Sequence, residues 1–148
     1  MGELIKNPVL GAICGDMIGV PYEWYCRKGL TINKDFKLWT DDSRFSDDSV
    51  MTIAIAEWLL DRPLNSDNLV KIMQKWGKCY PNAGYGGMFR KWLKEKNPQP
   101  YNSYGNGSAM RVSPVGCAFN TEETTLIIAE ELSVETSSIK IISISFNS

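Results

Sequence analysis

The segment from Ser46 to Leu60 constrains the fold more than any other part of this sequence. If it is helical, apolar side chains occupy nearly every face, because it contains Val50, Met51, Ile53, Ala54, Ile55, Ala56, Trp58, Leu59 and Leu60. A helix that is apolar all round must be surrounded by other elements. Ser46 is a good N-cap, and Asp61-Arg62-Pro63 ends the pattern. We therefore predict a central, buried helix from Ser46 to about Leu60.

Helical patterns also fill most of the chain on both sides of this segment. We predict helices over Pro8–Ile18, ended by Gly19 and Pro21, after a cap at Ser66-Asp67, around Met88–Leu93, over Ser108–Ala118, and from a cap at Thr121 to about Leu132. The stretch from Tyr22 to Arg44 has no clear period and is predicted to be a loop. Nothing before residue 133 alternates over more than a few positions, so the predicted fold class is all-α.

The last sixteen residues differ from the rest. Between Ser133 and Ser148 apolar residues alternate with serines in a β-type pattern, formed by Ile139, Ile141, Ile142, Ile144 and Phe146. A chain of 148 residues is long enough for one domain with a core and too short for two. We therefore expect one helical domain over 1–132 and an atypical, irregular or strand-like tail over 133–148, through which copies could pair as a homo-oligomer.

Composition excludes several classes of function. Sixteen basic and seventeen acidic residues, with no basic stripe, argue against nucleic acid as a partner. No apolar run approaches the roughly 18 residues that a membrane span needs. The chain has no histidine, which excludes Ser-His-Asp and Cys-His catalysis and histidine-ligated zinc. The four cysteines are far apart and follow no secretory leader, so we expect reduced thiols in the cytoplasm.

Two adjacent carboxylates follow the predicted cap of the central helix. Ser46, Asp47 and Asp48 all fall in its first turn, where free N–H groups and the helix dipole favour acids. Ordinary capping explains such a pattern. However, a buried helix would bring the two acids close to the core, where they repel unless a cation lies between them. Oxygen ligands without histidine or cysteine indicate magnesium or manganese.

Two further acids lie near the first predicted helix. Asp16 is surrounded by apolar neighbours and is either a solvated residue or part of a site. Glu23 follows Pro21 and lies between Tyr22 and Trp24. Loops often carry functional residues, and aromatic neighbours can raise a carboxyl pKa, so Glu23 is the better candidate. An exposed surface glutamate is the alternative.

A glycine-rich loop precedes the helix predicted at Ser108. The segment Gly105-Asn106-Gly107-Ser108-Ala109-Met110-Arg111 combines a flexible backbone with a helix start, a geometry that can present N–H groups to a phosphate. Ordinary loop capping explains it equally well. Arg111 could pair with a core acid or with a ligand anion.

Three of these segments resemble successive motifs of the ADP-ribosylglycohydrolase family, which includes the dinitrogenase-reductase activating glycohydrolases. They are Gly11-Ala-Ile-Cys-Gly-Asp16-Met-Ile-Gly19-Val-Pro-Tyr-Glu23, Phe45-Ser-Asp-Asp-Ser-Val-Met-Thr52 and Tyr104-Gly-Asn-Gly-Ser-Ala-Met-Arg111. They occur in the family's order and spacing, and the resemblance covers roughly residues 8 to 120. Three ordered motifs are a far more specific signal than any one of them.

The resemblance implies a compact, orthogonal multi-helix bundle with a binuclear magnesium or manganese centre in a cleft that holds ADP-ribose. It implies that Ser46, Asp47 and Asp48 are metal ligands, and that Glu23 acts with the Asp pair near the scissile ribose. The implied lining of the ADP-ribose pocket is Asn106, Gly107, Ser108 and Met110. The implied reaction is metal-assisted hydrolysis at the anomeric carbon of ribose, which releases ADP-ribose from protein side chains or small acceptors.

The sequence departs from this family in one respect. Family members are much longer and carry further metal ligands in an Asp-x-Asp-Thr type cluster, whereas no aspartate follows Asp67 here. We therefore expect a truncated member with a foreign or frame-shifted end and impaired catalysis. The alternatives are a catalytically inactive module that binds ADP-ribose or a partner, and a structural helical domain like the family's crystallin-like relatives.

Overall fold

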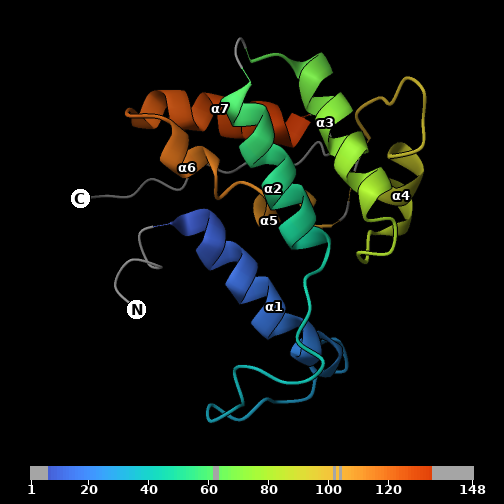
Figure 1. Cartoon of the computed structure of the whole chain (residues 1–148), viewed down its shortest axis with the longest axis vertical. Coiled ribbons are helices and arrows are strands. Elements are labelled where there is room, and N and C mark those ends of the chain that lie inside the picture. Colours follow the sequence, from blue (N-terminus) through green and yellow to red (C-terminus); the bar gives the residue numbers. More distant parts are fainter. Residues whose placement is uncertain (1–6, 62–63, 102, 104, 135–148) are drawn as a thin grey trace.

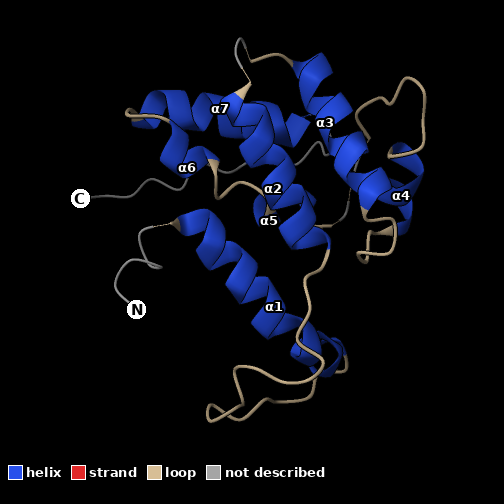
Figure 2. Cartoon of the chain, viewed as in Figure 1, coloured by secondary structure: helices blue, strands red, loops and turns tan. Residues whose placement is uncertain are grey.

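The computed structural model describes residues 7–61, 64–101, 103 and 105–134. The described residues form seven helices and no strand, which confirms the predicted all-α class (Figures 1 and 2). The helices are α1 (Pro8–Arg27), α2 (Asp47–Leu60), α3 (Ser66–Cys79), α4 (Gly87–Trp92), α5 (Gly107–Met110), α6 (Val115–Ala118) and α7 (Glu122–Val134). None of the helices in these ranges has the length and apolar content needed to cross a bilayer.

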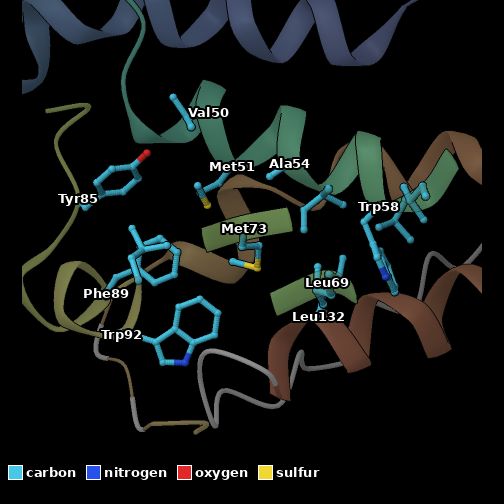
Figure 3. Close-up of a cluster of buried hydrophobic side chains, with 14 of the residues drawn as sticks. Val50, Met51, Ala54, Trp58, Leu69, Met73, Tyr85, Phe89, Trp92 and Leu132 are labelled. Carbon is cyan, nitrogen blue, oxygen red and sulfur yellow. The ribbon is translucent and has the colours of Figure 1, made fainter. Parts of the chain in front are cut away.

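Helix α2 is the centre of the fold, as its apolar sequence predicts. It packs against α1, α3, α5 and α6, and eight of its fourteen residues are buried (Figure 1). Its inner side chains meet residues of α3, α4 and α7 in one apolar cluster (Figure 3). The side chains labelled there are Val50, Met51, Ala54, Trp58, Leu69, Met73, Tyr85, Phe89, Trp92 and Leu132. Burial of this cluster is the main stabilising contribution to the fold.

The starts of three helices follow capping rules. The Ser46 hydroxyl accepts a hydrogen bond from the Asp48 N–H at 3.2 Å, which confirms Ser46 as the N-cap of α2. The Thr121 hydroxyl accepts one from the Thr124 N–H at 3.3 Å at the start of α7. The predicted cap of α3 at Ser66-Asp67 is wrong by one residue, because the Asn65 side chain accepts from the Asn68 N–H at 2.8 Å.

Helix α1 is longer than predicted. We expected it to end near Ile18, but it continues through Gly19 and Pro21 to Arg27. Proline fixes φ close to the helical value, so it can continue a helix at the loss of one hydrogen bond, here to the carbonyl of Met17. The Tyr22 hydroxyl donates to the Lys37 carbonyl at 2.5 Å and fastens this part of the helix to the following loop. The loop predicted from Tyr22 therefore begins only after Arg27.

The single helix predicted over Ser108–Ala118 is also wrong. The structure has two short helices there, α5 and α6, with Pro114 immediately before the second. Proline lacks the N–H that would donate to the Met110 carbonyl, and it disfavours helical geometry in the residue before it. The Thr52 hydroxyl of α2 donates to that Met110 carbonyl instead, at 3.3 Å.

The C-terminal expectations fall mainly outside the described residues. Helix α7 continues to Val134, two residues past the limit expected at Leu132. The predicted strand-like tail and its pairing between copies concern residues from 135 onward, which are not among those described.

Candidate active site

The first turn of α2 carries the two predicted carboxylates at the edge of the core. Ser46, Asp47 and Asp48 are half-buried, and the next residues, Ser49 and Val50, are fully buried. The acids lie there because the helix begins where the apolar pattern begins, and its free N–H groups favour negative charge. The ordinary capping interpretation is therefore correct for Ser46, whereas the partial burial of both acids at the edge of the core is unfavourable for their charged forms.

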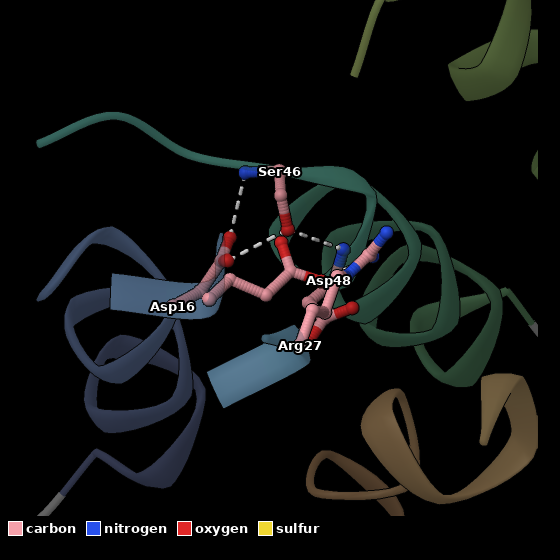
Figure 4. A network of polar contacts seen from close by, with 5 residues as sticks. Asp16, Arg27, Ser46 and Asp48 are labelled. Carbon is pink, nitrogen blue, oxygen red and sulfur yellow. Dashed lines mark hydrogen bonds and ion pairs between the residues drawn. The ribbon is translucent and has the colours of Figure 1, made fainter. Parts of the chain in front are cut away.

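Asp16 of α1 is bonded to the same turn (Figure 4). Its Oδ2 accepts from the Ser46 N–H at 2.7 Å, and its Oδ1 accepts from the Ser46 hydroxyl at 2.7 Å. Its Oδ2 also accepts from the Ser49 N–H at 3.2 Å and from the Ser49 hydroxyl at 2.5 Å. Asp16 is thus half-buried and bonded four times, and the alternative of a solvated surface acid is wrong.

Glu23 lies on α1, two turns after Asp16, and not in a loop as predicted. Seven residues correspond to nearly two helical turns, so both acids are on the same face of α1. Glu23 Oε1 forms an ion pair with Arg27 Nη2 at 2.5 Å, and the Glu23 side chain is 57% exposed. An exposed pair of this kind contributes little to stability and can open readily.

Burial and the neighbouring carboxylates raise the pKa values of Asp47 and Asp48. Burial raises the pKa of Asp48 to about 6, and the negative charges of Asp16, Asp47 and Glu23 act in the same direction. Burial also raises the pKa of Asp47, opposed by a backbone hydrogen bond and by the positive charge of Arg27. The site therefore holds more negative charge than its surroundings neutralise, a condition typical of functional sites.

Two cavities meet at these acids. The larger has a volume of about 940 Å³ and is lined by faces of α1 and α2 together with the segment after α3. The smaller has a volume of about 320 Å³ and is lined by the glycine-rich loop near α5. The residues that line both are Glu23, Arg27, Asp47, Asp48, Gly84 and Met110. The carboxylates thus lie at the junction of the two cavities.

Every residue that the sequence indicated lies at one of these cavities. Ser46 lines the larger one, and the smaller one is lined by the predicted pocket residues Asn106, Gly107, Ser108 and Met110. The second motif, residues 45–52, and the third, residues 104–111, are more than fifty residues apart in sequence, yet the Thr52 hydroxyl of the one donates to the Met110 carbonyl of the other. The fold therefore brings the three motifs together.

Arg111 forms part of the wall of the smaller cavity. It is 1% exposed, and its Nη2 donates to the Leu132 carbonyl of α7 at 3.1 Å. Burial lowers its pKa to about 10, so the guanidinium remains charged at neutral pH. The Leu132 carbonyl is thus one partner of the guanidinium, and pairing with a core acid or a ligand anion stays a prediction.

The sequence left the role of Asp16 open and did not indicate Gly84 as part of the site. The unexpected continuation of α1 past Pro21 puts Asp16 and Glu23 on one face of the helix. Gly84 has φ +109°, and a Cβ placed there would lie 3.3 Å from Asp47 Oδ1. A glycine in a glycine-rich turn is a signal for positive φ, but the sequence does not tell which residue the turn approaches.

The donor set suits a hard divalent cation held by few protein ligands. Asp47 and Asp48 supply carboxylate oxygens, and the Ser46 hydroxyl keeps one lone pair after accepting from Asp48. Magnesium commonly uses one or two carboxylates and completes its octahedron with water. No group of three or more Asp, Glu, Cys or His side chains able to hold a metal occurs in the described ranges. The residues fit a partly hydrated cation and not a closed protein cage.

Paired carboxylates at the wall of a cavity, on a helical scaffold, define a class of site that serves glycosidic bond hydrolysis or divalent-cation binding. The chain belongs to the ADP-ribosylglycohydrolase family, whose model matches residues 3–139. This family comprises hydrolases that cleave glycosidic bonds in ADP-ribosylated substrates, which confirms the family and the hydrolase class indicated by the three motifs. The resemblance to the dinitrogenase-reductase activating subgroup stays a prediction.

Proposed function

We propose that this chain hydrolyses the bond between ADP-ribose and a protein side chain or small acceptor, with help from a divalent cation. The observation that carries this proposal is the junction of the two cavities at Asp47 and Asp48. The smaller cavity, beside residues 106–110, would hold ADP-ribose. The larger cavity, which the same acids also line, leaves room for the acceptor.

Each side chain has a role that its position supports. Asp47, Asp48 and the Ser46 hydroxyl would hold Mg²⁺ or Mn²⁺. When bound, such a cation supplies Lewis-acid stabilisation of the developing negative charge. Glu23, next to both cavities, would take the proton of the attacking water at its Oε once the Arg27 ion pair opens. Asn106, Gly107, Ser108 and Met110 would orient ADP-ribose.

A second candidate function is binding of ADP-ribose without turnover. It is favoured by one observation: the residues that the structure describes contain no group of three or more acids placed to hold a metal. The pocket loop could then serve as a recognition site while the cation is held too weakly for catalysis. The structural interpretation has less support, because a structural domain has no need for Asp47 and Asp48 at the junction of two cavities.

A single comparison separates these functions. Release of ADP-ribose from an ADP-ribosylated arginine substrate is followed with Mg²⁺ or Mn²⁺, and free ADP-ribose is titrated by calorimetry. The test variant is Asp47→Asn. The matched control is Asp61→Asn, at the opposite end of α2, where the exposed carboxylate accepts from the Asn68 side chain at 2.9 Å.

The expected result is cation-dependent release that Asp47→Asn abolishes and Asp61→Asn leaves intact. Binding of ADP-ribose without any release supports the second function. Absence of both binding and release contradicts the proposal and leaves only a structural role.

We also propose a cytoplasmic location. All four cysteines are unpaired, and three of them, Cys26, Cys79 and Cys117, are exposed. Exposed thiols persist in a reducing compartment. Alkylation of the native protein from cell extract, counted by mass spectrometry, would give four modified thiols after unfolding without reductant; a lower count would contradict this location.

A further inference from the structure

The carboxylate of Asp16 accepts four hydrogen bonds. Three donors reach Oδ2 and one reaches Oδ1, at distances of 2.5 to 3.2 Å. A carboxylate offers about four lone-pair positions, so little capacity is left for a cation. Asp16 is therefore poorly suited to be a ligand itself, although it lines the same cavity as Asp47 and Asp48.

The four donors lie on both sides of the acidic pair. Two belong to Ser46, directly before Asp47, and two belong to Ser49, directly after Asp48. Bonds to both flanking residues fix the backbone of the dipeptide between them. The side-chain directions of Asp47 and Asp48 follow from that backbone.

The same bonds relate α1 to α2. Glu23 lies on the face of α1 that carries Asp16, and both residues line the larger cavity. Among the described residues, Asp16 accepts all the side-chain hydrogen bonds that join α1 to the start of α2. These bonds therefore fix the position of Glu23 relative to Asp47 and Asp48.

The charge of Asp16 is also informative. A neutral acceptor would be enough to join the two helices by hydrogen bonds. A third acid beside two others is unfavourable in the absence of a cation. Its presence adds negative potential where a cation would be held. Groups that orient the direct ligands of a metal act in this manner in many metal sites.

We propose that Asp16 is a positioning residue of the hydrolytic site, which clamps Ser46 and Ser49 so that Asp47 and Asp48 face the cavity at a fixed separation from Glu23. The inference rests on the proposed function. It assigns Asp16 no contact with substrate or cation.

The test measures binding of Mn²⁺ alone to the full chain by electron paramagnetic resonance, together with thermal unfolding. Ser49→Ala removes one donor of the clamp and leaves every charge in place. Ser49→Thr restores the hydroxyl, and Asp16→Asn replaces the acceptor by a group of the same size. Asn65→Ala, which removes the N-cap of α3, is the control for a general loss of stability.

We expect Ser49→Ala to weaken Mn²⁺ binding about tenfold and Asp16→Asn to weaken it more, within the roughly 10–100-fold range known for residues that orient metal ligands. Ser49→Thr should bind like the wild type. Asn65→Ala should lower the unfolding temperature and leave Mn²⁺ binding unchanged.

The outcomes are distinct. If the wild type binds Mn²⁺ and Ser49→Ala and Asp16→Asn bind it equally well, the positioning role is wrong and the proposed function stands. It is also wrong if Asn65→Ala weakens binding as much as Ser49→Ala. If the wild type neither binds Mn²⁺ nor releases ADP-ribose, both the proposed function and the clamp's role in it are overturned.

Discussion

At the scale of single residues, Asp48 illustrates how a site opposes stability. The ordinary pKa of its carboxyl is 3.8, and burial together with three neighbouring acids raises it to about 6. The helix dipole favours the charged form by only about 0.3–1 kcal/mol and does not reverse this direction. An ionised Asp48 therefore destabilises the folded protein at neutral pH.

Asp48→Asn should stabilise the metal-free chain at pH 7. Because the pKa is higher in the folded state, the folded chain binds more protons between about pH 4 and 6, and stability falls as pH rises through that window. The gain should be on the order of 1 kcal/mol, since the half-exposed side chain is screened by water. Urea unfolding with EDTA at pH 4 and pH 7 measures it. If Asp48→Asn raised the free energy of unfolding equally at both pH values, the raised pKa of Asp48 would be wrong.

A second prediction at this scale concerns Gly84→Ala, with Gly29→Ala as a matched control. Both have positive φ, +109° and +68°, but only a Cβ at Gly84 would approach another group, Asp47 Oδ1 at 3.3 Å. Gly84→Ala and Gly29→Ala should each cost about 1 kcal/mol of backbone strain. Only Gly84→Ala should also reduce Mn²⁺ binding or ADP-ribose release. Equal effects of the two variants on the site would show that the contact with Asp47 is unimportant.

At the scale of elements, two prolines determine where the structure departs from simple pattern reading. Pro114 divides a predicted helix into α5 and α6, whereas Pro21 lies inside α1 without ending it. The difference lies in the surroundings. The carbonyl left free before Pro114 accepts from Thr52, and the helix around Pro21 is held by Asp16 and Tyr22.

Thr52→Val should destabilise the chain by about 1–3 kcal/mol. The side chains have similar shape, but valine leaves the Met110 carbonyl without the donor that replaces the missing proline N–H. The glycine-rich loop before α5 should loosen as a result. Denaturant unfolding measures the change, and Thr52→Ser, which keeps the hydroxyl, should lie close to the wild type. If serine and valine destabilise equally, the hydrogen bond is not the cause.

Pro21→Ala should raise the free energy of unfolding by at least about 1 kcal/mol, because alanine restores the N–H donor to the Met17 carbonyl and is the best helix former. Circular dichroism during urea unfolding measures this. A loss of stability would mean that the rigid φ of Pro21 is needed to hold α1 in its present direction.

At the scale of the whole molecule, the site is an assembly of three segments around α2. Helix α1 brings Asp16 and Glu23, α2 brings the acidic pair, and the loop before α5 closes the smaller cavity. None of the twenty residues of α1 is fully buried, so this helix is attached mainly along α2 and through Asp16. Binding at the site should therefore stabilise the arrangement of the helices.

Mg²⁺ or Mn²⁺ should raise the unfolding temperature at pH 7 in a concentration-dependent manner. A ligand that binds only the folded state stabilises it by mass action. The increase should shrink near pH 5, where Asp48 becomes protonated, and should be absent in Asp47→Asn. Scanning calorimetry with the cation, followed by EDTA, measures it. An increase of the same size in Asp47→Asn would place the cation elsewhere.

Much of the fold and the identity of the candidate residues followed from the sequence. The burial of α2 follows from apolar side chains on all its faces, and the cap at Ser46 follows from local chemistry within one turn. Three ordered motifs identified the family and all eight candidate residues, of which Glu23, Asp47, Asp48 and Asn106–Ser108 with Met110 line one cavity. These features depend on residues close together in the chain.

The tertiary structure alone decided the features that depend on contacts between distant segments. A local pattern cannot show that Asp16 accepts four bonds from a turn thirty residues away, that Thr52 replaces the donor lost at Pro114, or that Gly84 approaches Asp47. For the same reason it could not show that α1 continues past Pro21, since the contacts that support this part of the helix come from α2 and the following loop. Local chemistry determined which groups are present, and packing determined which of them meet.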